Sequence, residues 1–367
     1  MNIDQTVVRH ALPDDEPGSG DTDWFYRQTP FEREEIKHLV SYKRNILGIR
    51  EDGRYPKKPT LTYPHILPDG YKTAAFCPNI ADQIIAHLKE EGIQEHTELL
   101  NLKSSQAACL NILFPLRLNK SLAARVLHKH LPGLDVISDI QFEYTGQDEA
   151  PGARLECTEW LGEPPNGKRG QYRTSIDAAI FWSDTSSRAH ITLVEWKYTE
   201  RSFGSCSAFA NANALEQAAC KSSTYKDTCL LVNHGPRRNR RYWDHLDASG
   251  IKLEKMKGLS GCPFRGPFYQ LMRQFLVAQY LRNKHPQTIV DVLAIHFAKN
   301  KALNDVPKEL KPLCRPDHST VISAWNSTLA DVPELRSLHI EDIMTEFDAA
   351  SETDTEWRSF IRQRYRV

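Results

Sequence analysis

The sequence lacks any apolar run of the roughly 18 to 20 residues that a membrane-spanning helix requires. It also lacks a CxxC pair, and its eight cysteines show no small disulfide framework. The N-terminus has no basic segment followed by an apolar stretch, which argues against secretion. We therefore expect a cytoplasmic protein in a reducing compartment, with no membrane partner.

Net charge is absent too, because 47 basic side chains balance 47 acidic ones. No global basic field would draw the chain onto nucleic acid, so any polyanionic partner must meet a local patch. Charge is nevertheless unevenly distributed along the sequence. Residues 1–25 are acidic and are predicted to form a flexible tail, whereas residues 235–285 carry an excess of basic side chains.

The spacing of apolar residues changes along the chain, and no internal repeat is present. Helical spacing after Asn79 and Ser104 and over 121–131 gives way to alternation typical of strands. Strands are predicted over 136–144, 154–161, 174–182, 191–198, 228–233 and 289–297. Helices are predicted over 208–221, 267–282 and the last thirty residues. This order predicts an α/β chain with a central mixed β-sheet flanked by helices.

The tripeptide Glu195-Trp196-Lys197 follows an apolar run at 191–194 that is typical of a buried strand. Charges in such a strand are costly unless they have partners or a function. Side chains alternate along a strand, so Glu195 and Lys197 point to the same face. The Glu-x-Lys pattern therefore indicates a site here, although the pattern alone is weak.

A hairpin would bring a second carboxylate to this site. If the polar turn over 183–188 is centred near Ser186, Asp177 lies opposite Glu195. Facing carboxylates repel one another, which calls for a cation between them. The alternative interpretation is a cross-strand ion pair, but two acids and one base leave an uncompensated charge.

The donors at this predicted site are those that a hard divalent ion prefers. Asp177, Glu195 and the backbone carbonyl of Trp196 would supply oxygen ligands for Mg²⁺ or Mn²⁺. A metal so placed lowers the pKa of bound water and polarises a phosphoryl oxygen. Lys197 would then orient or deprotonate the attacking water, or stabilise charge developing on the phosphate; the sequence leaves both roles open.

This pattern resembles the PD-(D/E)XK nuclease superfamily, in a bacterial branch of restriction endonuclease-like proteins. Asp177 matches the motif aspartate, Glu195 and Lys197 match the (D/E)XK pair, and Gln106 matches a supporting helix residue. Ile176 stands where the plainest pattern has proline.

The resemblance implies a restriction endonuclease-like fold that is divided along the chain. Its parts would be an N-terminal elaboration over 26–100, a nuclease core over 101–235, and a basic, helical elaboration over 236–367 packed on the core.

The resemblance further implies a metal-dependent endodeoxyribonuclease that hydrolyses phosphodiester bonds in bacterial restriction or anti-phage defence. DNA would be its partner, with RNA as an alternative. A homodimer and defence-system partner proteins are compatible with this role. A DNA repair or RNA-directed nuclease, and a catalytically silent nucleic-acid-binding subunit, remain open.

Three further groups of residues could serve such a site. The basic run with its adjacent aromatic residue could bind nucleic acid or form a solvated loop; it comprises Arg237, Arg238, Arg240, Arg241 and Trp243. One of three glutamates could add a metal ligand, namely Glu143, Glu156 or Glu159. Four cysteines could bind zinc or an iron–sulfur cluster, but their irregular spacing favours ordinary buried thiols; these are Cys206, Cys220, Cys229 and Cys262.

Overall fold

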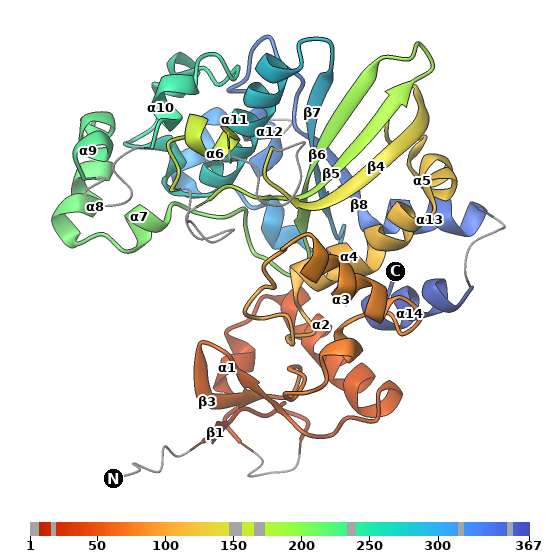
Figure 1. Cartoon of the computed structure of the whole chain (residues 1–367). Helices are drawn as coiled ribbons and strands as arrows, with labels where there is room; N and C mark the ends of the chain where they lie inside the picture. Colours follow the sequence, from red (N-terminus) through yellow and green to blue (C-terminus); the bar gives the residue numbers. More distant parts are fainter. Residues whose placement is uncertain are drawn as a thin grey trace. The chain divides into compact units, whose positions relative to one another are not determined.

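The computed structural model describes residues 7–15, 20–146, 156–164, 173–232, 240–314, 319–350 and 355–367 (Figure 1). The chain divides into two compact units, which are described separately. Unit 1 comprises Met1–Leu127, Phe297–Asn300 and His339–Val367, and unit 2 comprises His128–His296 and Lys301–Leu338. The boundaries of these units differ from the segment boundaries expected at residues 100 and 235, because unit 1 combines the first part of the chain with its last residues. No helix in the described part of the chain is long and apolar enough to cross a membrane.

A five-stranded sheet with the order β4-β5-β6-β7-β8 runs through unit 2. Its strands are β4 (Leu134–Tyr144), β5 (Ile176–Asp184), β6 (Ala189–Lys197), β7 (Ile289–His296) and β8 (Arg336–His339). β4, β5 and β6 pair antiparallel, whereas β7 pairs parallel with β6. The prediction of an α/β fold with a mixed sheet is therefore confirmed.

The β5–β6 hairpin forms where the sequence predicts it. Asp184 caps the turn because its carboxylate accepts hydrogen bonds from the backbone N–H groups of Ser186 and Arg188, at 2.9 and 3.0 Å. β6 is buried along almost its whole length, as expected for a central strand whose two edges are both paired. The end of β6 is therefore a place where polar side chains are held away from bulk water.

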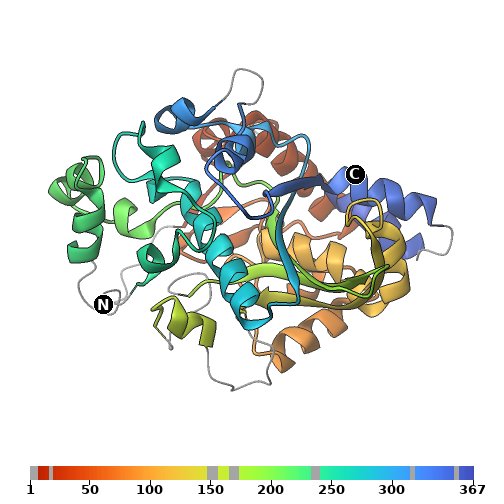
Figure 2. The same ribbon diagram turned by 90° about the horizontal axis from the view of Figure 1, so that it is seen from above.

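Unit 2 also contains helices. They are α6 (Glu156–Trp160), α7 (Ser207–Ala210), α8 (Ala214–Cys220), α9 (Tyr225–Val232), α10 (Tyr242–His245), α11 (Phe268–Lys284) and α12 (Val321–Asn326). Short 3₁₀ turns also occur, at η3 (Leu253–Met256), η4 (Pro263–Arg265), η5 (Lys301–Asn304) and η6 (Lys308–Leu313). α11 packs against β7 (Figure 2). Trp325 packs edge-on against Phe268 and Phe275, with centroids 5.0 and 5.3 Å away, which joins α11 to α12.

Two predicted strands of unit 2 are wrong. The described part of the segment 154–161 forms helix α6, in which the backbone N–H of Leu161 donates to the carbonyl of Cys157 at 2.9 Å. The segment 228–233 falls largely within helix α9. Both are short apolar runs, for which periodicity alone does not separate a strand from a buried helix.

Unit 1 joins the first part of the chain to its last helices. Its strands are β1 (Val8–Arg9), β2 (Gly53–Tyr55) and β3 (Lys58–Tyr63). Its helices are α1 (Asp23–Tyr26), α2 (Pro30–Ser41), the π-helical η1 (Tyr42–Ile46), the 3₁₀ turn η2 (Lys72–Ala75), α3 (Ala81–Glu90), α4 (Ser105–Leu118), α5 (Lys120–Leu127), α13 (Ile340–Ala349) and α14 (Thr355–Tyr365). Trp357 of α14 donates its indole N–H to the carbonyl of Asn111 in α4 at 2.6 Å, which ties the end of the chain into this unit.

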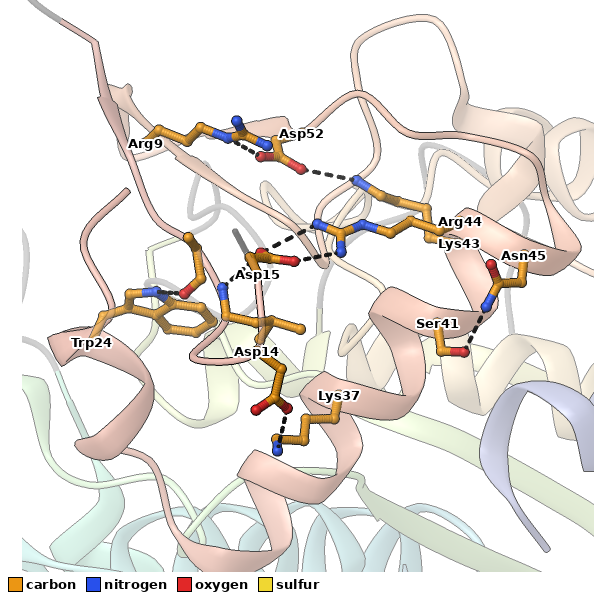
Figure 3. Close-up of polar contacts among 12 residues, drawn as sticks. Arg9, Asp14, Asp15, Trp24, Lys37, Ser41, Lys43, Arg44, Asn45 and Asp52 are labelled. Carbon is orange, nitrogen blue, oxygen red and sulfur yellow. Dashed lines mark hydrogen bonds and ion pairs between the residues drawn. The ribbon is translucent and has the colours of Figure 1, made fainter. Parts of the chain in front are cut away.

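The described part of the acidic N-terminal segment packs onto unit 1, so the predicted flexible tail is wrong for these residues. β1 pairs parallel with β3. Asp15 pairs with Arg44 and Asp14 with Lys37, each at 2.8 Å (Figure 3). The indole of Trp24 is buried and donates to the carbonyl of Ala11 at 3.1 Å. Acidic composition suggested a solvated tail, but these acids face basic partners on α2 and η1.

Candidate active site

Asp177 and Glu195 lie on paired strands at the end of the hairpin away from its turn. β5 and β6 pair with Ala178 opposite Val194, and the same register continued by one residue sets Asp177 opposite Glu195. The backbone N–H of Trp196 also donates to Asp177 Oδ2 at 2.7 Å. The predicted register is therefore confirmed for the paired residues, and Asp177 and Glu195 are the next residue on each strand.

Glu195 is held from two sides. Lys197 Nζ lies 2.6 Å from Glu195 Oε1. The side-chain amide of Gln274 on α11 donates to the other carboxylate oxygen, Oε2. All three side chains are buried. The sequence predicts the Lys197 contact but not the one to Gln274, which comes from a helix some eighty residues along the chain.

Burial raises the pKa of Asp177 well above its ordinary value, and the charge of Glu195 raises it further. Burial also raises the pKa of Glu195, against the opposing effect of Lys197. Burial lowers the pKa of Lys197, but the carboxylates of Glu195, Glu200 and Asp177 outweigh that effect, so the pKa lies above its ordinary value. The site thus carries more negative charge than one ammonium group stabilises.

Glu143 on β4 belongs to the same row of residues. Phe142 pairs with Ala178 and Tyr144 with Ile176, so Glu143 lies opposite Asp177 across the β4–β5 pair. The backbone of Glu143 has a φ of 50°, which is uncommon for a residue with a side chain. Its charge raises the pKa of both Asp177 and Glu195. Three adjacent strands therefore direct carboxylates toward one region of the sheet.

The other two glutamates considered as metal ligands lie in α6. Glu156 accepts a hydrogen bond from the hydroxyl of Tyr280 at 3.1 Å and lies 3.6 Å from Lys284 Nζ. Glu159 lies on the same helix. Neither residue lies on the strands β4, β5 and β6. Of the three glutamates, Glu143 is therefore the one that strand pairing places opposite Asp177.

The donors at the hairpin fit a hard divalent ion. Asp177 and Glu195 offer carboxylate oxygens, and the backbone carbonyl of Trp196 directly follows Glu195 in the sequence. Among the described residues, no three or more His, Cys, Asp or Glu side chains are grouped so that they could hold a metal ion. A protein contribution of one or two carboxylates is the usual one for Mg²⁺, which keeps several waters and takes further ligands from a phosphate.

Gln106 lies near the start of α4, in unit 1, whereas the acid pair lies in unit 2. Its amide oxygen accepts from the backbone N–H of His96 at 2.8 Å, and its amide nitrogen donates to the carbonyl of Gln94 at 3.3 Å. These bonds fix the loop that precedes α4. A catalytic role for Gln106 stays a prediction.

A cavity of about 380 Å³ in unit 2 adjoins the acid pair. Gln274, which contacts Glu195, is one of its lining residues, and Arg240 and Trp243 of the predicted basic run are others. Arg241 is exposed and pairs with Asp244 at 3.3 Å. Arg237 and Arg238 lie outside the described residues.

Residues that line this cavity contact Glu163, a buried carboxylate that the sequence analysis missed. It accepts hydrogen bonds from the hydroxyls of Thr174 and Tyr242, at 2.6 and 2.5 Å. Arg240 and Arg273 approach the same carboxylate oxygen to 3.5 and 3.6 Å. A lone glutamate in a loop gives no signal in sequence, because its partners come from three distant segments.

The four cysteines considered as metal ligands lie in one region of unit 2. Burial raises the pKa of Cys262 to about 12, and the thiols of Cys229, Cys206 and Cys220 raise it as well. The backbone N–H of Cys262 donates to the carbonyl of Cys220 at 2.8 Å. Cys206 and Cys229 line the cavity. All four are free thiols in this structure, and ordinary thiols stay the prediction, with a zinc or iron–sulfur site as the alternative that the sequence does not favour.

A family model described as "Restriction Endonuclease associating with ARP" matches residues 37–366. No curated protein and no solved structure matches the chain. The match spans most of both compact units and is consistent with the restriction endonuclease-like superfamily.

Proposed function

The chain belongs to the family of restriction endonucleases associating with ARP, and from this membership and the geometry of the hairpin we propose that it is a metal-dependent nuclease. It would hydrolyse phosphodiester bonds, with DNA as its substrate and restriction or anti-phage defence in the bacterial cytoplasm as its role. One observation carries the proposal. Asp177 and Glu195 directly adjoin the paired residues Ala178 and Val194 on neighbouring strands, the charge of Glu195 acts on Asp177, and Lys197 lies beside Glu195.

Asp177, Glu195 and the backbone carbonyl of Trp196 would hold Mg²⁺ or Mn²⁺. When bound, the ion would polarise a phosphoryl oxygen and lower the pKa of a coordinated water. Gln274 holds the carboxylate of Glu195 in place through Oε2. The backbone N–H of Trp196 does the same for Asp177 through Oδ2. Each acid therefore has one oxygen fixed by a hydrogen bond, and the second oxygen of Glu195 faces the ammonium group of Lys197.

Lys197 supplies the positive charge of the site. Its ammonium group is buried beside Glu195, and its pKa is raised by the surrounding carboxylates despite burial. A lysine that stays protonated is suited to orienting the attacking water and to stabilising negative charge on the phosphate.

Plasmid cleavage tests this proposal. Supercoiled plasmid would be incubated with Mg²⁺ or Mn²⁺ and wild-type protein, beside Asp177→Asn, Glu195→Gln and Lys197→Ala. We expect cleavage by the wild type and a loss of at least about a hundredfold in each variant, because electrostatic contacts of this kind contribute about 3–4 kcal/mol to catalysis. Glu254→Gln, which changes an exposed acid of the same unit, should cleave like the wild type.

The rival functions give different results in the same assay. An RNA-directed nuclease would cut single-stranded RNA and spare duplex DNA. A catalytically silent binding subunit would cut neither with either metal, and its binding to nucleic acid would survive Asp177→Ala and Lys197→Ala. Association with a partner protein is suggested by the family's description alone, and co-purification from the native host would test it.

A further inference from the structure

The cavity beside the acid pair has the size and lining of a binding site for part of a nucleic acid strand. Its volume of about 380 Å³ falls in the range of roughly 300–1,000 Å³ typical of small-molecule pockets. A paired duplex is too wide to enter such a space, whereas one nucleotide is not. The lining residues that carry the argument are Arg240, Tyr242, Trp243, Tyr269, Arg273 and Gln274.

Positive charge is in excess at this cavity. The lining includes the guanidinium groups of Arg240 and Arg273 and no carboxylate. Both guanidinium groups approach the buried carboxylate of Glu163, at 3.5 and 3.6 Å. Two guanidinium groups in a cavity wall that includes no carboxylate favour an anionic ligand. Arginine presents a planar set of donors that matches a phosphate.

Aromatic rings stand next to these cations. The Arg240 guanidinium lies 5.6 Å from the ring centroid of Tyr242, and that of Arg273 lies 5.5 Å from the ring centroid of Tyr269. Trp243 is half-buried at the same cavity and packs edge-on against Phe264. Cationic groups interleaved with rings are the usual means of binding single strands, because each base can stack on a ring while arginine holds the backbone.

Gln274 connects this cavity to the acid pair. It lines the cavity and also donates its amide to Glu195. The amide oxygen of Gln274 is buried and accepts a hydrogen bond from no described residue. A ligand that fills the cavity therefore ends next to the residue that positions Glu195, and it can offer a donor to this oxygen.

We propose that the cavity binds one unpaired nucleotide of the substrate, with its phosphate against Arg240 and Arg273 and its base against the neighbouring rings. This inference rests on the proposed nuclease function of the adjacent acid pair. It narrows the substrate class to DNA that has an unpaired nucleotide next to the cleavage position, such as a single strand or an overhang.

Binding of labelled oligonucleotides, measured by fluorescence anisotropy in EDTA, tests the proposal without any cleavage. We expect the wild type to bind a single strand and an overhang more tightly than a blunt duplex of the same sequence. Arg240→Gln and Trp243→Leu should weaken single-strand binding about tenfold, since one stacked base or its phosphate contact contributes about 1–3 kcal/mol. Lys257→Gln removes an exposed charge from the same unit and should bind like the wild type.

Competition identifies the ligand. Thymidine monophosphate should displace the labelled strand, and inorganic phosphate or thymidine alone should do so far less well, because each fills only one part of the cavity. Phosphate acting as well as the nucleotide would overturn base recognition. Unchanged binding by Arg240→Gln and Trp243→Leu, with folding confirmed by circular dichroism, would overturn the site itself.

The two proposals fail separately. Asp177→Asn should abolish cleavage and leave binding in EDTA intact, because Asp177 does not line the cavity. If the wild type cuts no substrate, but Arg240→Gln still weakens single-strand binding, the nuclease function is rejected and the nucleotide site is kept. If the wild type cuts a blunt duplex and a single strand equally well, the preference for DNA with an unpaired nucleotide is rejected and the nuclease function is kept.

Discussion

Gln274 on α11 donates its side-chain amide to the carboxylate of Glu195 on β6, and both residues are buried. This bond joins the longest helix of unit 2 to the strand that carries the acid and the lysine. It also places the residue that orients Glu195 in the wall of the neighbouring cavity. Binding in the cavity and the position of Glu195 are thereby linked through one side chain.

Replacing Gln274 should impair catalysis without removing any group that we expect to contact the metal. Gln274→Leu leaves one oxygen of Glu195 buried without its donor, a loss of about 1–3 kcal/mol. We expect kcat to fall about tenfold or more. Steady-state kinetics on a cleaved oligonucleotide would measure this. Gln274→Glu should be worse than Gln274→Leu, because it adds a negative charge next to Glu195; equal activities would contradict the role assigned here.

Divalent ions should raise the melting temperature of the protein through the row of carboxylates. Mg²⁺ or Mn²⁺ stabilises the folded state by binding it and not the unfolded chain. Asp177→Asn should abolish the shift, and Glu143→Gln should reduce it, since the Glu143 charge acts on both acids. Differential scanning fluorimetry with and without EDTA gives the answer. Ca²⁺ serves as an ion that binds oxygen ligands without supporting cleavage, and a shift of equal size in Asp177→Asn would refute the metal site.

Lys43 should make the stability of unit 1 depend on alkaline pH. Its ammonium group is fully buried, and burial lowers its pKa to about 8 against the opposing charge of Asp52. The folded state therefore binds fewer protons than the unfolded chain between about pH 8 and 10.5. Stability contributed by this residue is lowest below pH 8 and rises across that window.

The change over the whole window should be on the order of 3 kcal/mol, at about 1.4 kcal/mol per pKa unit. Urea unfolding of the wild type and of Lys43→Met at both ends of the window would measure it. We expect the variant to lose this rise. The ammonium group of Lys43 contacts the carbonyls of Glu51 and Ile66 at 2.7 and 3.0 Å. If the unfolding free energy changes with pH in the same way in both proteins, these contacts leave the pKa of Lys43 at its ordinary value.

Trp357 should be a large contributor to the stability of unit 1. Its ring is buried, packs against Phe347 with centroids 4.3 Å apart, and donates to the carbonyl of Asn111 at 2.6 Å. Trp357→Ala should cost about 3–5 kcal/mol of unfolding free energy, as expected for loss of a buried large aromatic side chain. Tyr26→Ala, at an exposed position, should change it by less than about 0.5 kcal/mol. Chemical denaturation of both variants would compare them.

The candidate site was predictable where it depends on local sequence. The turn at Ser183–Arg188 and the apolar run before Glu195 are enough to give the register that sets Asp177 opposite Glu195. Period-2 alternation also places Lys197 beside Glu195. These features need only one hairpin, and a hairpin is specified by its own residues.

What depends on distant segments was not predictable. Gln274 and Glu163 carry no local pattern, because their partners lie far along the chain. The strand β4 was predicted, but its pairing with β5, and hence the position of Glu143, depends on irregular register within the sheet. α6 and α9 were mistaken for strands because short apolar stretches fit both periods.

β6 pairs with a neighbour along each of its edges, and almost all of its residues are buried. Backbone amides in such a strand exchange with solvent only when the whole cooperative unit opens. Glu195 and Lys197 therefore do not fray away from Asp177 in small fluctuations. Mutations that destabilise this unit should therefore lower the fraction of folded, active molecules. The turnover of each folded molecule should stay unchanged, so a destabilised variant would behave like a lower concentration of wild-type enzyme.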